Sequence, residues 1–359
     1  MRFIDKEIKP LSAPTSLCLS ITNSCNLNCR HCLATGVEEE LDTEEMIKII
    51  KKIGNVKVFS VGIFGGEPLV RKDIWRFIEE LKKFPISLSL NTNGTLITPN
   101  IAKRLKEFGV KDITLSLDGS EEKIVKNIRG EGVFNKTIKG IENALKEGLN
   151  ILISTTLMKL NYNDMENIVH LCKKLGVRNV RFNPIFYTGN AACFIEELYL
   201  SPKELREIIK RLKVLKEKFG DFITGAAVQL VDLVEEAEKN PPPETNEIEV
   251  PPCAAGVTRC NIKPNGAITP CEVLWDVEAG NLKEKDFIDI WKNSPVMRKF
   301  RTYFILTKDD IGDCINCIYR RICFTGHRCN PYYYLYGIRN KEFYCLRPDG
   351  ITEPILGVK

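Results

Sequence analysis

The chain has 359 residues, with 52 Lys and Arg against 47 Asp and Glu, so its net charge is only +5. A balance this small does not indicate a nucleic-acid partner, which would show a concentrated basic patch. No apolar run reaches the length of a membrane span, and the N-terminus lacks the apolar core of a signal peptide. We therefore expect a cytoplasmic globular protein with one large domain and one smaller domain. Abundant Lys and Glu, with a single Gln at Gln229, are typical of a thermophile.

From residue 17 to about 186, short apolar runs alternate with amphipathic stretches. The pattern predicts strands at 17–22, 57–64, 87–91, 112–117, 150–157 and 179–184. It predicts helices between them at 43–53, 72–83, 97–108, 133–147 and 163–175. Strands that alternate with helices form parallel β/α units, and six units form a partial barrel rather than a closed one. Chemistry in such barrels lies at the carboxyl ends of the strands.

Beyond the sixth strand, two surface helices are expected at 202–218 and 227–239. Residues 240–252 are rich in proline and acidic residues, so we expect a linker without a regular element. The predicted domains are an N-terminal extension (1–16), the barrel with its following helices (17–239), this linker (240–252) and a cysteine-rich α+β domain (253–359).

Three of the fourteen cysteines, Cys25, Cys29 and Cys32, follow the first predicted strand. Three thiolates on one loop can hold three corners of an iron–sulfur cube and leave the fourth iron open to a cofactor or substrate. The alternative is a structural zinc site, which needs a fourth ligand nearby. His31 is adjacent to Cys32 and cannot easily reach the same ion, so the spacing favours the cluster.

Further motifs follow the next strands. Gly65 and Gly66 permit close backbone approach to a ligand, and Glu67 can accept from an ammonium group; the alternative is a tight turn. Asn91-Thr92-Asn93-Gly94 follows the third strand, while Ser116 and Asp118 share one face of the fourth. Arg129 lies further on, and taken alone it could equally be a solvated surface arginine.

Eight cysteines lie after residue 250. Cys260 and Cys271 flank Asn265-Gly266, which predicts a hairpin with a type I′ turn. The others are Cys253, Cys314, Cys317, Cys323, Cys329 and Cys345. Eight thiols are two sets of four, and the spacing is equally compatible with two clusters and with two zinc sites. Cys18, Cys172 and Cys193 fall outside these groups and receive no role.

The CxxxCxxC loop and the strand-end motifs of residues 15–190 resemble radical S-adenosylmethionine (SAM) enzymes. The resemblance implies that Cys25, Cys29 and Cys32 hold a [4Fe–4S] cluster whose open iron binds SAM, and that SAM is cleaved to a 5′-deoxyadenosyl radical. It places the SAM amino group at the glycine turn and the SAM ribose and carboxylate near the fourth strand end. The cofactor-binding residues implied are Gly65, Gly66, Glu67, Asn93, Ser116, Asp118 and Arg129. His31 stands where many members have an aromatic residue.

The spacing of Cys253, Gly266 and Cys271, followed by Cys314-x-x-Cys317, resembles the SPASM domain. The resemblance implies auxiliary [4Fe–4S] cluster I on Cys253, Cys260, Cys271 and Cys329. Auxiliary cluster II would use Cys314, Cys317, Cys323 and Cys345, giving three clusters in all. One departure is the five-residue spacing before Cys329, which makes His327 a conceivable substitute ligand.

The layout is similar to maturases of mycofactocin and pyrroloquinoline quinone biosynthesis and to anaerobic sulfatase-maturating enzymes. It implies an oxidoreductase that takes hydrogen from a peptide or protein side chain, giving an oxidised, crosslinked or decarboxylated product. Ferredoxin or flavodoxin would supply electrons. Only about sixteen residues precede the first strand, so no N-terminal leader-binding domain is expected; a separate protein could supply one, or the substrate could be recognised differently. Glu272 is the candidate proton acceptor, with Asp276 as its rival. The alternatives are a tetrapyrrole-modifying radical SAM enzyme and a non-catalytic iron–sulfur or zinc scaffold.

Overall fold

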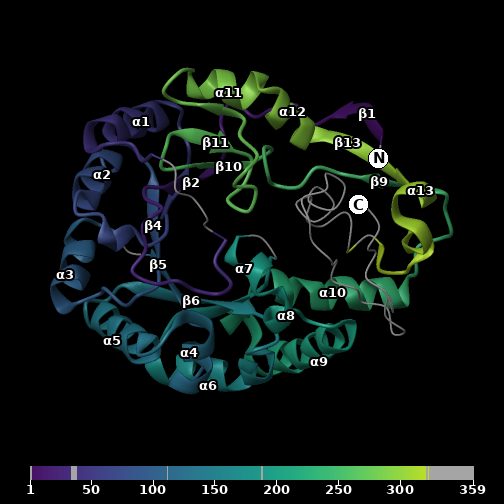
Figure 1. The fold of residues 1–359 in the computed structure, drawn as a ribbon, viewed down its shortest axis with the longest axis horizontal. Helices are drawn as coiled ribbons and strands as arrows, with labels where there is room; N and C mark the ends of the chain where they lie inside the picture. The colour runs from purple at the N-terminus through teal and green to yellow at the C-terminus, as the bar shows by residue number, and fades with distance from the viewer. Residues whose placement is uncertain (1, 34–38, 111, 187–188, 321, 323–359) are drawn as a thin grey trace.

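The computed structural model describes residues 2–33, 39–110, 112–186, 189–320 and 322. Six neighbouring parallel strands form the centre of a curved sheet, in chain order (Figure 1). They are β2 (Ser16–Ser20), β3 (Ser60–Phe64), β4 (Ser87–Thr92), β5 (Asp112–Ser116), β6 (Asn150–Leu157) and β7 (Asn179–Pro184). The predicted partial barrel of six β/α units is therefore confirmed.

Helices cover the convex side of this sheet (Figure 1). The predicted ones are α1 (Thr43–Asn55), α2 (Ile74–Leu81), α3 (Pro99–Glu107), α5 (Val133–Lys146) and α6 (Met165–Leu175). The sequence reading missed α4 (Glu122–Arg129), an eight-residue helix without a side-chain N-cap hydrogen bond. Short 3-10 turns lie at η1 (Pro68–Val70) and η2 (Tyr162–Asp164). The start of the second predicted strand, 57–64, also differs, because Lys57 has a positive φ of 58° and β3 begins only at Ser60.

The two faces of the barrel sheet differ in chemistry. Strand residues such as Leu19 and Ile63 are completely buried in the main apolar core, which they share with the covering helices. The alternate positions, which face inward, carry small or polar side chains such as Gly62, Ser89 and Ser154. Phe64 shares this face, and its ring lies over Gly62.

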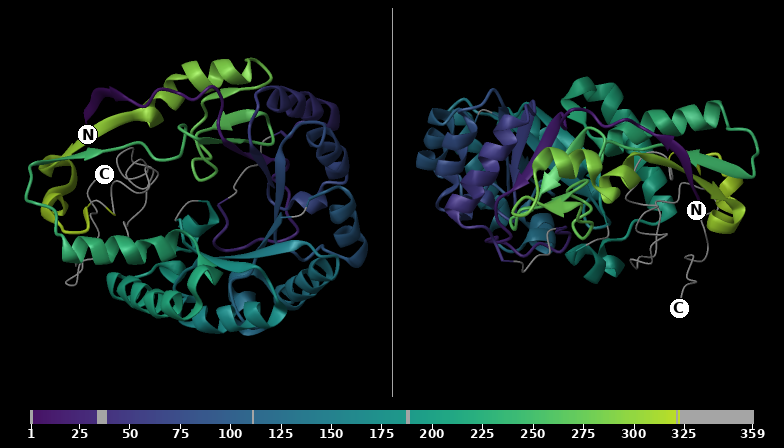
Figure 2. Two further views of the ribbon diagram at one scale, coloured as in Figure 1. Left: turned by 180° about the vertical axis from the view of Figure 1, so that it is seen from behind. Right: turned by 90° about the horizontal axis from the view of Figure 1, so that it is seen from above.

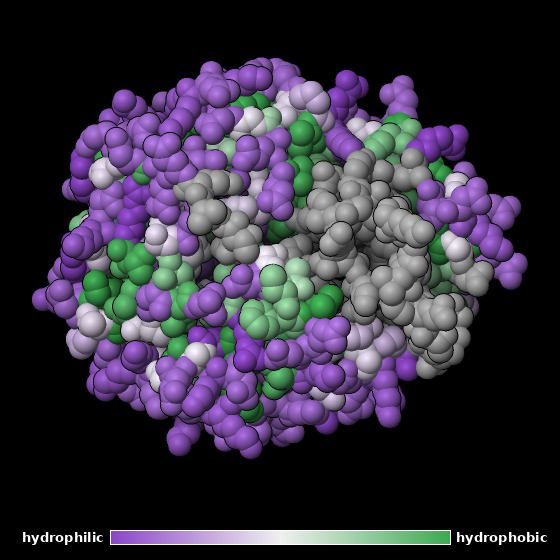
Figure 3. Space-filling model, viewed as in Figure 1, coloured by the Kyte–Doolittle hydropathy of each residue, from purple (hydrophilic) through white to green (hydrophobic). Residues whose placement is uncertain are grey.

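The chain after β7 closes one side of the barrel with short elements and two long helices. They are α7 (Asn190–Cys193), α8 (Ile195–Leu198), α9 (Pro202–Phe219), η3 (Gly220–Phe222), β8 (Ile223–Thr224) and α10 (Ala226–Lys239). Helix α9 begins with a capping box in which Ser201 and Glu204 bond each other's backbone. On the viewed face, apolar side chains gather near α7 and α8 (Figure 3), where Phe194 and Ile195 are only partly buried.

The cysteine-rich region extends the barrel sheet. Strand β10 (Arg259–Ile262) pairs in parallel with β2, and β11 (Ala267–Thr269) and β12 (Gly280–Asn281) follow in antiparallel order. The predicted hairpin is confirmed, but the prediction of a type I′ turn is wrong. Among the described residues Lys57 is the only non-glycine with positive φ, so Asn265 cannot take that turn's first position. The turn instead starts at Lys263, whose carbonyl accepts from the Gly266 N–H. Pro264 and Asn265 are its central residues, and Gly266 takes the left-handed conformation.

A second sheet of three strands, β1 (Arg2–Glu7), β13 (Thr302–Thr307) and β9 (Glu247–Val250), lies at the end of the molecule opposite α2 and α3 (Figures 1 and 2). The expectation that 240–252 holds no regular element is wrong, because β9 lies within it. Ile248 and Val250 alternate with glutamates and bury against β13, which is why these four residues form a strand. The remaining elements are α11 (Phe287–Asn293), α12 (Pro295–Arg301), α13 (Lys308–Ile311) and η4 (Gly312–Asn316).

Candidate functional site

The three-cysteine loop leaves the carboxyl end of β2 and is held by elements that are distant in sequence. The Arg30 N–H donates to the Ile128 carbonyl of α4 at 3.0 Å. At α7, the Asn190 N–H donates to the Cys32 carbonyl at 2.9 Å, and the Asn190 side chain donates to the Cys29 carbonyl at 3.2 Å. The path of the loop is therefore set by tertiary contacts on both sides.

The glycine pair packs directly against the start of this loop. The Gly66 N–H donates to the Thr22 carbonyl at 2.8 Å. A Cβ at Gly65 would lie 2.6 Å from the Thr22 oxygen, and one at Gly66 would lie 2.5 Å from the Ser24 oxygen. Neither distance is possible for a real side chain, so both glycines are required by the approach of one backbone to the other. Their predicted contact with SAM stays a prediction.

Glu67 joins the turn after β3 to the end of β4. Its side chain is fully buried and accepts from the Leu69 N–H at 3.1 Å, the Thr92 hydroxyl at 2.8 Å and the Asn93 N–H at 2.7 Å. Burial raises the pKa of the carboxyl group, while these donors favour its ionised form. Both oxygens are engaged by the chain itself, which gives Glu67 a definite structural task.

Asn93 extends this link to the cysteine loop. Its Nδ2 donates to the Asn26 side-chain oxygen at 2.9 Å and lies 3.9 Å from the Cys25 sulfur. Its Oδ1 accepts from the Thr95 N–H at 2.9 Å, which fixes the orientation of the amide. The ends of β3 and β4 and the loop after β2 thus form one hydrogen-bonded unit.

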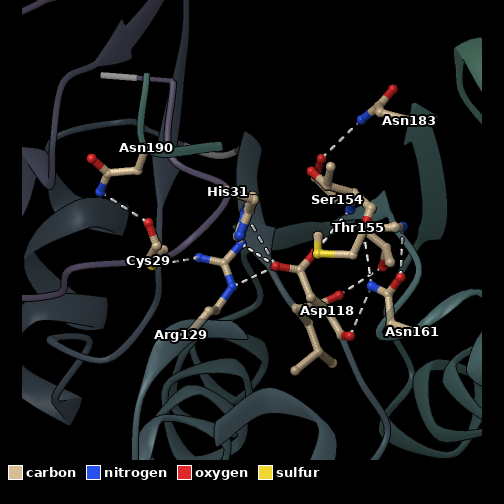
Figure 4. A network of polar contacts seen from close by, with 12 residues as sticks. Cys29, His31, Asp118, Arg129, Ser154, Thr155, Asn161, Asn183 and Asn190 are labelled. Carbon is tan, nitrogen blue, oxygen red and sulfur yellow. Dashed lines mark hydrogen bonds and ion pairs between the residues drawn. The ribbon is translucent and has the colours of Figure 1, made fainter. Parts of the chain in front are cut away.

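Arg129 and Asp118 form the charged centre of the site (Figure 4). The Arg129 Nε and Nη2 atoms both lie 2.6 Å from Asp118 Oδ2, and Nη1 lies 3.8 Å from the Cys29 sulfur. Both side chains are buried, so the reading of Arg129 as a solvated surface arginine is wrong. His31 Nε2 lies 3.4 Å from Asp118, and burial lowers the pKa of His31 to about 4, so the ring is neutral at pH 7.

The other side of Asp118 is tied to the end of β6 and to the turn that follows it. The Thr156 N–H donates to Asp118 Oδ1 at 2.8 Å, and the Asn161 side chain donates to the Asp118 carbonyl at 3.0 Å (Figure 4). Ser116 lies opposite Ser154 in the sheet, and the Ser154 hydroxyl accepts from Asn183 at 3.1 Å. With Glu67 and Asn93, polar groups from the ends of β3, β4, β5, β6 and β7 therefore lie at one edge of the barrel, as the sequence predicts.

The thiols of the loop suit an anionic iron–sulfur group. Burial raises the pKa of Cys29 to about 11, so this thiol needs a metal to become a thiolate at neutral pH. The Arg129 guanidinium and the Asn93 amide point at Cys29 and Cys25 and can offset the charge of bound thiolates. Across the described ranges no three His, Cys, Asp or Glu are placed as ligands of one metal ion. A [4Fe–4S] cube differs from such a single-ion site, because each of its thiolate ligands binds a different iron atom.

The described C-terminal cysteines fall into different environments. Cys253 and Cys271 pack against the same small apolar cluster around Leu274. Cys260 pairs with Leu17 and lies in the main core. The Cys317 N–H donates to the Cys314 carbonyl at 3.2 Å, which closes the turn of this CxxC pair. Three predicted ligands, Cys323, Cys329 and Cys345, and the substitute His327 lie outside the described residues.

Glu272 belongs to a cluster that the sequence did not reveal. It lies 3.1 Å from Arg259 of β10 and 3.1 Å from the Cys271 sulfur. The Cys18 sulfur, on the inner face of β2, lies 3.8 Å from both Glu272 and Arg259. Glu272 is therefore not a plain strand glutamate facing water, whereas its rival Asp276 is exposed.

Asn190 and Cys18 are the site residues that sequence reasoning missed. The rule that chemistry follows strand ends would have drawn attention to Gly189-Asn190, which comes soon after β7. A Cβ at Gly189 would lie 2.5 Å from the Cys32 oxygen, so this glycine also permits a close approach to the loop. Cys18 carried no such signal, because its neighbours come from a strand some 240 residues later.

Comparison with known proteins defines the class of this chain. The model of the radical SAM superfamily matches residues 19–172, and the model of an iron–sulfur cluster-binding domain, SPASM, matches residues 253–318. The chain contains a radical SAM domain followed by a SPASM domain. It is thus a radical SAM enzyme, with a cluster that binds SAM and with auxiliary iron–sulfur ligation in its C-terminal region.

Several relatives match over most of their length. The AdoMet-dependent heme synthase of Methanosarcina barkeri is 29% identical over 353 residues, which cover 94% of this chain and 98% of that one. The mycofactocin maturase MftC of Mycolicibacterium smegmatis is 26% identical over 334 residues, covering 90% and 81%. The structure of Streptococcus suis SuiB bound to precursor peptide SuiA aligns with a TM-score of 0.69 at 21% identity, covering 89% of this chain and 73% of that one.

Within the described residues, no helix combines the length and the apolar character that crossing a membrane requires.

Proposed function

We propose that this chain is a maturase that removes hydrogen from a side chain of a peptide or protein. Bound SAM and its reduced cluster would supply the 5′-deoxyadenosyl radical that abstracts the hydrogen atom. Cys25, Cys29 and Cys32 hold this cluster in the proposal. Gly65, Gly66, Glu67, Asn93, Ser116, Asp118 and Arg129 form the surrounding SAM site.

The observation that carries the proposal is the position of the cysteine loop. Tertiary contacts from the ends of β3 and β4 and from α4 and α7 hold it at the edge of the barrel where all the strand-end polar groups meet. A scaffold would need only the thiols. An arginine aimed at Cys29 and a buried carboxylate that orients it are the parts of a site that handles a charged cofactor.

Two auxiliary clusters complete the proposal. Cluster I is assigned to Cys253, Cys260, Cys271 and Cys329, and cluster II to Cys314, Cys317, Cys323 and Cys345. Their task is to accept the electron left on the substrate or to anchor the substrate. Cys260 lies in the main apolar core, so its role as a ligand of cluster I is the most demanding part of this assignment. Ferredoxin or flavodoxin would donate electrons, a separate protein would bind any leader peptide, and the reaction would take place in the cytoplasm.

Support for a peptide substrate comes from relatives. The mycofactocin maturase matches 90% of this chain, across both domains. The fold is also that of SuiB, whose structure holds its precursor peptide. A second candidate is a tetrapyrrole, because three relatives at 26–29% identity are AdoMet-dependent heme synthases.

The decisive experiment is anaerobic reconstitution with iron and sulfide, followed by SAM and dithionite. The proposal expects methionine and 5′-deoxyadenosine, detected by mass spectrometry. A protein loaded with its clusters that forms neither product would be a scaffold.

Substrate class is tested with deuterium. Cells that express the chain are grown in deuterated medium, and their extract is separated into a peptide fraction and a tetrapyrrole fraction. Deuterium that enters 5′-deoxyadenosine from the peptide fraction supports the maturase. Transfer from the tetrapyrrole fraction alone favours the second candidate.

A further inference from the structure

Cys18 is buried on the inner face of β2, but its surroundings are not those of a core cysteine. Within the described part of the chain it belongs to none of the apolar clusters, although its neighbours Leu17 and Leu19 both do. A buried free cysteine usually packs as a small apolar side chain. The Cys18 sulfur instead lies 3.8 Å from an oxygen of Glu272 and 3.8 Å from a nitrogen of Arg259. This thiol therefore faces a charged site.

The register of the sheet brings Cys18 toward Cys271. Cys18 lies opposite Asn261 of β10, and Asn261 lies opposite Thr269 of β11, so the three residues share one face of the sheet. Cys271 follows Thr269 by two residues. The Oε2 atom of Glu272 lies 3.8 Å from the Cys18 sulfur and 3.1 Å from the Cys271 sulfur. A single carboxylate oxygen thus spans the gap between the two sulfurs.

Cys260 lies on the other face of β10. It is opposite Leu17, and both side chains are buried in the main apolar core. Cys253, in contrast, packs against the same small apolar cluster as Cys271. Cys18 is therefore better placed than Cys260 to share a metal group with Cys253 and Cys271.

Arg259 gives this site a positive charge and a spare hydrogen-bond donor. Its Nη2 atom lies 3.1 Å from Glu272 and 3.8 Å from the Cys18 sulfur, and its buried Nε atom has no hydrogen-bond partner. A buried donor without a partner costs free energy. Hydrogen bonds to the sulfurs of an iron–sulfur cluster are one of the features that set its reduction potential. An anionic cluster beside Arg259 would use both the charge and the donor.

We propose that Cys18 is a ligand of auxiliary cluster I, in the place that the resemblance to SPASM domains gives to Cys260. The Cys18 thiol would lose its proton and bond to one iron atom, and Cys253 and Cys271 would bond to two others. The inference rests on the proposed function, because this cluster is one of the two proposed there. Cys18 precedes Cys25 by seven residues, so one short segment would contribute ligands to two clusters.

Iron content of full-length variants is the test. The parent chain has the three cysteines of the SAM-cluster loop replaced by Ala, so that only the auxiliary clusters contribute iron. Cys18→Ala, Cys271→Ala and Cys260→Ala are added to it one at a time, and each protein is reconstituted anaerobically with iron and sulfide. Cys172→Ala is the matched control, because Cys172 is a completely buried thiol of the main apolar core.

The parent should hold about eight iron, two cubes of four. Cys18→Ala and Cys271→Ala should each lose about one to four of these, because a cube without one ligand either sheds that iron or falls apart. Cys260→Ala and Cys172→Ala should lose none.

A conservative variant separates ligation from support of the fold. Cys18→Ser keeps the size of the side chain and offers an oxygen to the iron, so the EPR spectrum and midpoint potential of one auxiliary cluster should change. Cys260→Ala should leave both as they are in the parent. The inference is overturned if Cys18→Ala keeps all the auxiliary iron, if Cys18→Ser leaves the spectrum unchanged, or if Cys260→Ala loses the same iron.

Failure of the proposed function is seen separately. A parent that holds only four iron would contradict the assignment of two auxiliary clusters, and this inference with it. The parent has no SAM cluster, so these measurements do not depend on radical chemistry or on the substrate. Formation of 5′-deoxyadenosine by the unaltered protein tests that chemistry by itself.

Discussion

Arg129 and Asp118 form a buried ion pair that lies between the cysteine loop and the ends of β5 and β6. Two nitrogens of Arg129, Nε and Nη2, lie 2.6 Å from Asp118 Oδ2, and the third, Nη1, faces the Cys29 sulfur. An arginine that is already paired in this way is held in one orientation before any cofactor binds. Asp118 therefore positions Arg129, in addition to its own predicted contact with SAM.

Breaking this pair should be costly. Asp118→Asn leaves a buried guanidinium without its counter-charge, so we expect the free energy of unfolding to fall by about 3–5 kcal/mol. Thermal unfolding of the cluster-loaded protein measures the change. Glu44→Gln is the control, because it removes an exposed pair with Arg76 at 2.8 Å and should have no measurable effect. Equal stability of the two variants would show that the Asp118 pair contributes nothing.

Removing the three cysteines of the loop should abolish SAM cleavage without removing the iron of the other clusters. Replacing Cys25, Cys29 and Cys32 together with Ala should abolish formation of 5′-deoxyadenosine. About two-thirds of the iron should remain, since each cube keeps its own ligands. Iron analysis and mass spectrometry check both outcomes. A variant that still cleaves SAM, or one that loses all its iron, contradicts the assignment.

Metal content separates clusters from zinc in the C-terminal region. After anaerobic reconstitution we expect about twelve iron and twelve sulfide per chain, three cubes of four. The measurement is elemental analysis with a sulfide assay. About two zinc with four iron would instead indicate four-cysteine zinc sites.

Replacing Gly66 should disturb the protein through a steric clash rather than through a strained backbone conformation. The added methyl group of Gly66→Ala would meet the Ser24 carbonyl at 2.5 Å and displace the cysteine loop. We expect a loss of about 1–3 kcal/mol in stability and at least a tenfold slower SAM cleavage. Gly148→Ala is the matched control, because Gly148 has a φ of 74° but open space around it. Its effect should be confined to stability, and an equal loss of SAM cleavage there would refute the collision argument.

Glu272 is expected to take a proton as the substrate radical is oxidised. Glu272→Gln keeps the shape of the side chain but removes the base, so the final product should fall by about a hundredfold. Deuterium transfer from the substrate into 5′-deoxyadenosine should continue. The carboxyl group lies 3.1 Å from Arg259, which holds it in place beside the Cys271 sulfur. A normal product yield would leave Glu272 as a partner of Arg259 only.

Local patterns determined much of the fold. Alternating apolar residues set β6 and β7 at the bounds that the structure has, 150–157 and 179–184. The capping residues Asp42 and Glu45 set the start of α1, where each bonds the backbone of the other. The cysteine spacing and the glycine pair were equally readable, because short motifs carry their chemistry within a few residues.

Only the tertiary structure decided how these pieces meet. The pairing of β10 with β2 joins residues some 240 positions apart, and it alone places Arg259 and Glu272 beside Cys18. The same pairing places Cys260 in the main apolar core, which the spacing of the cysteines in the sequence could not predict. Sheet register and the face of each residue depend on which strands become neighbours, and that choice is made by burial of the whole apolar core rather than by any local run of sequence.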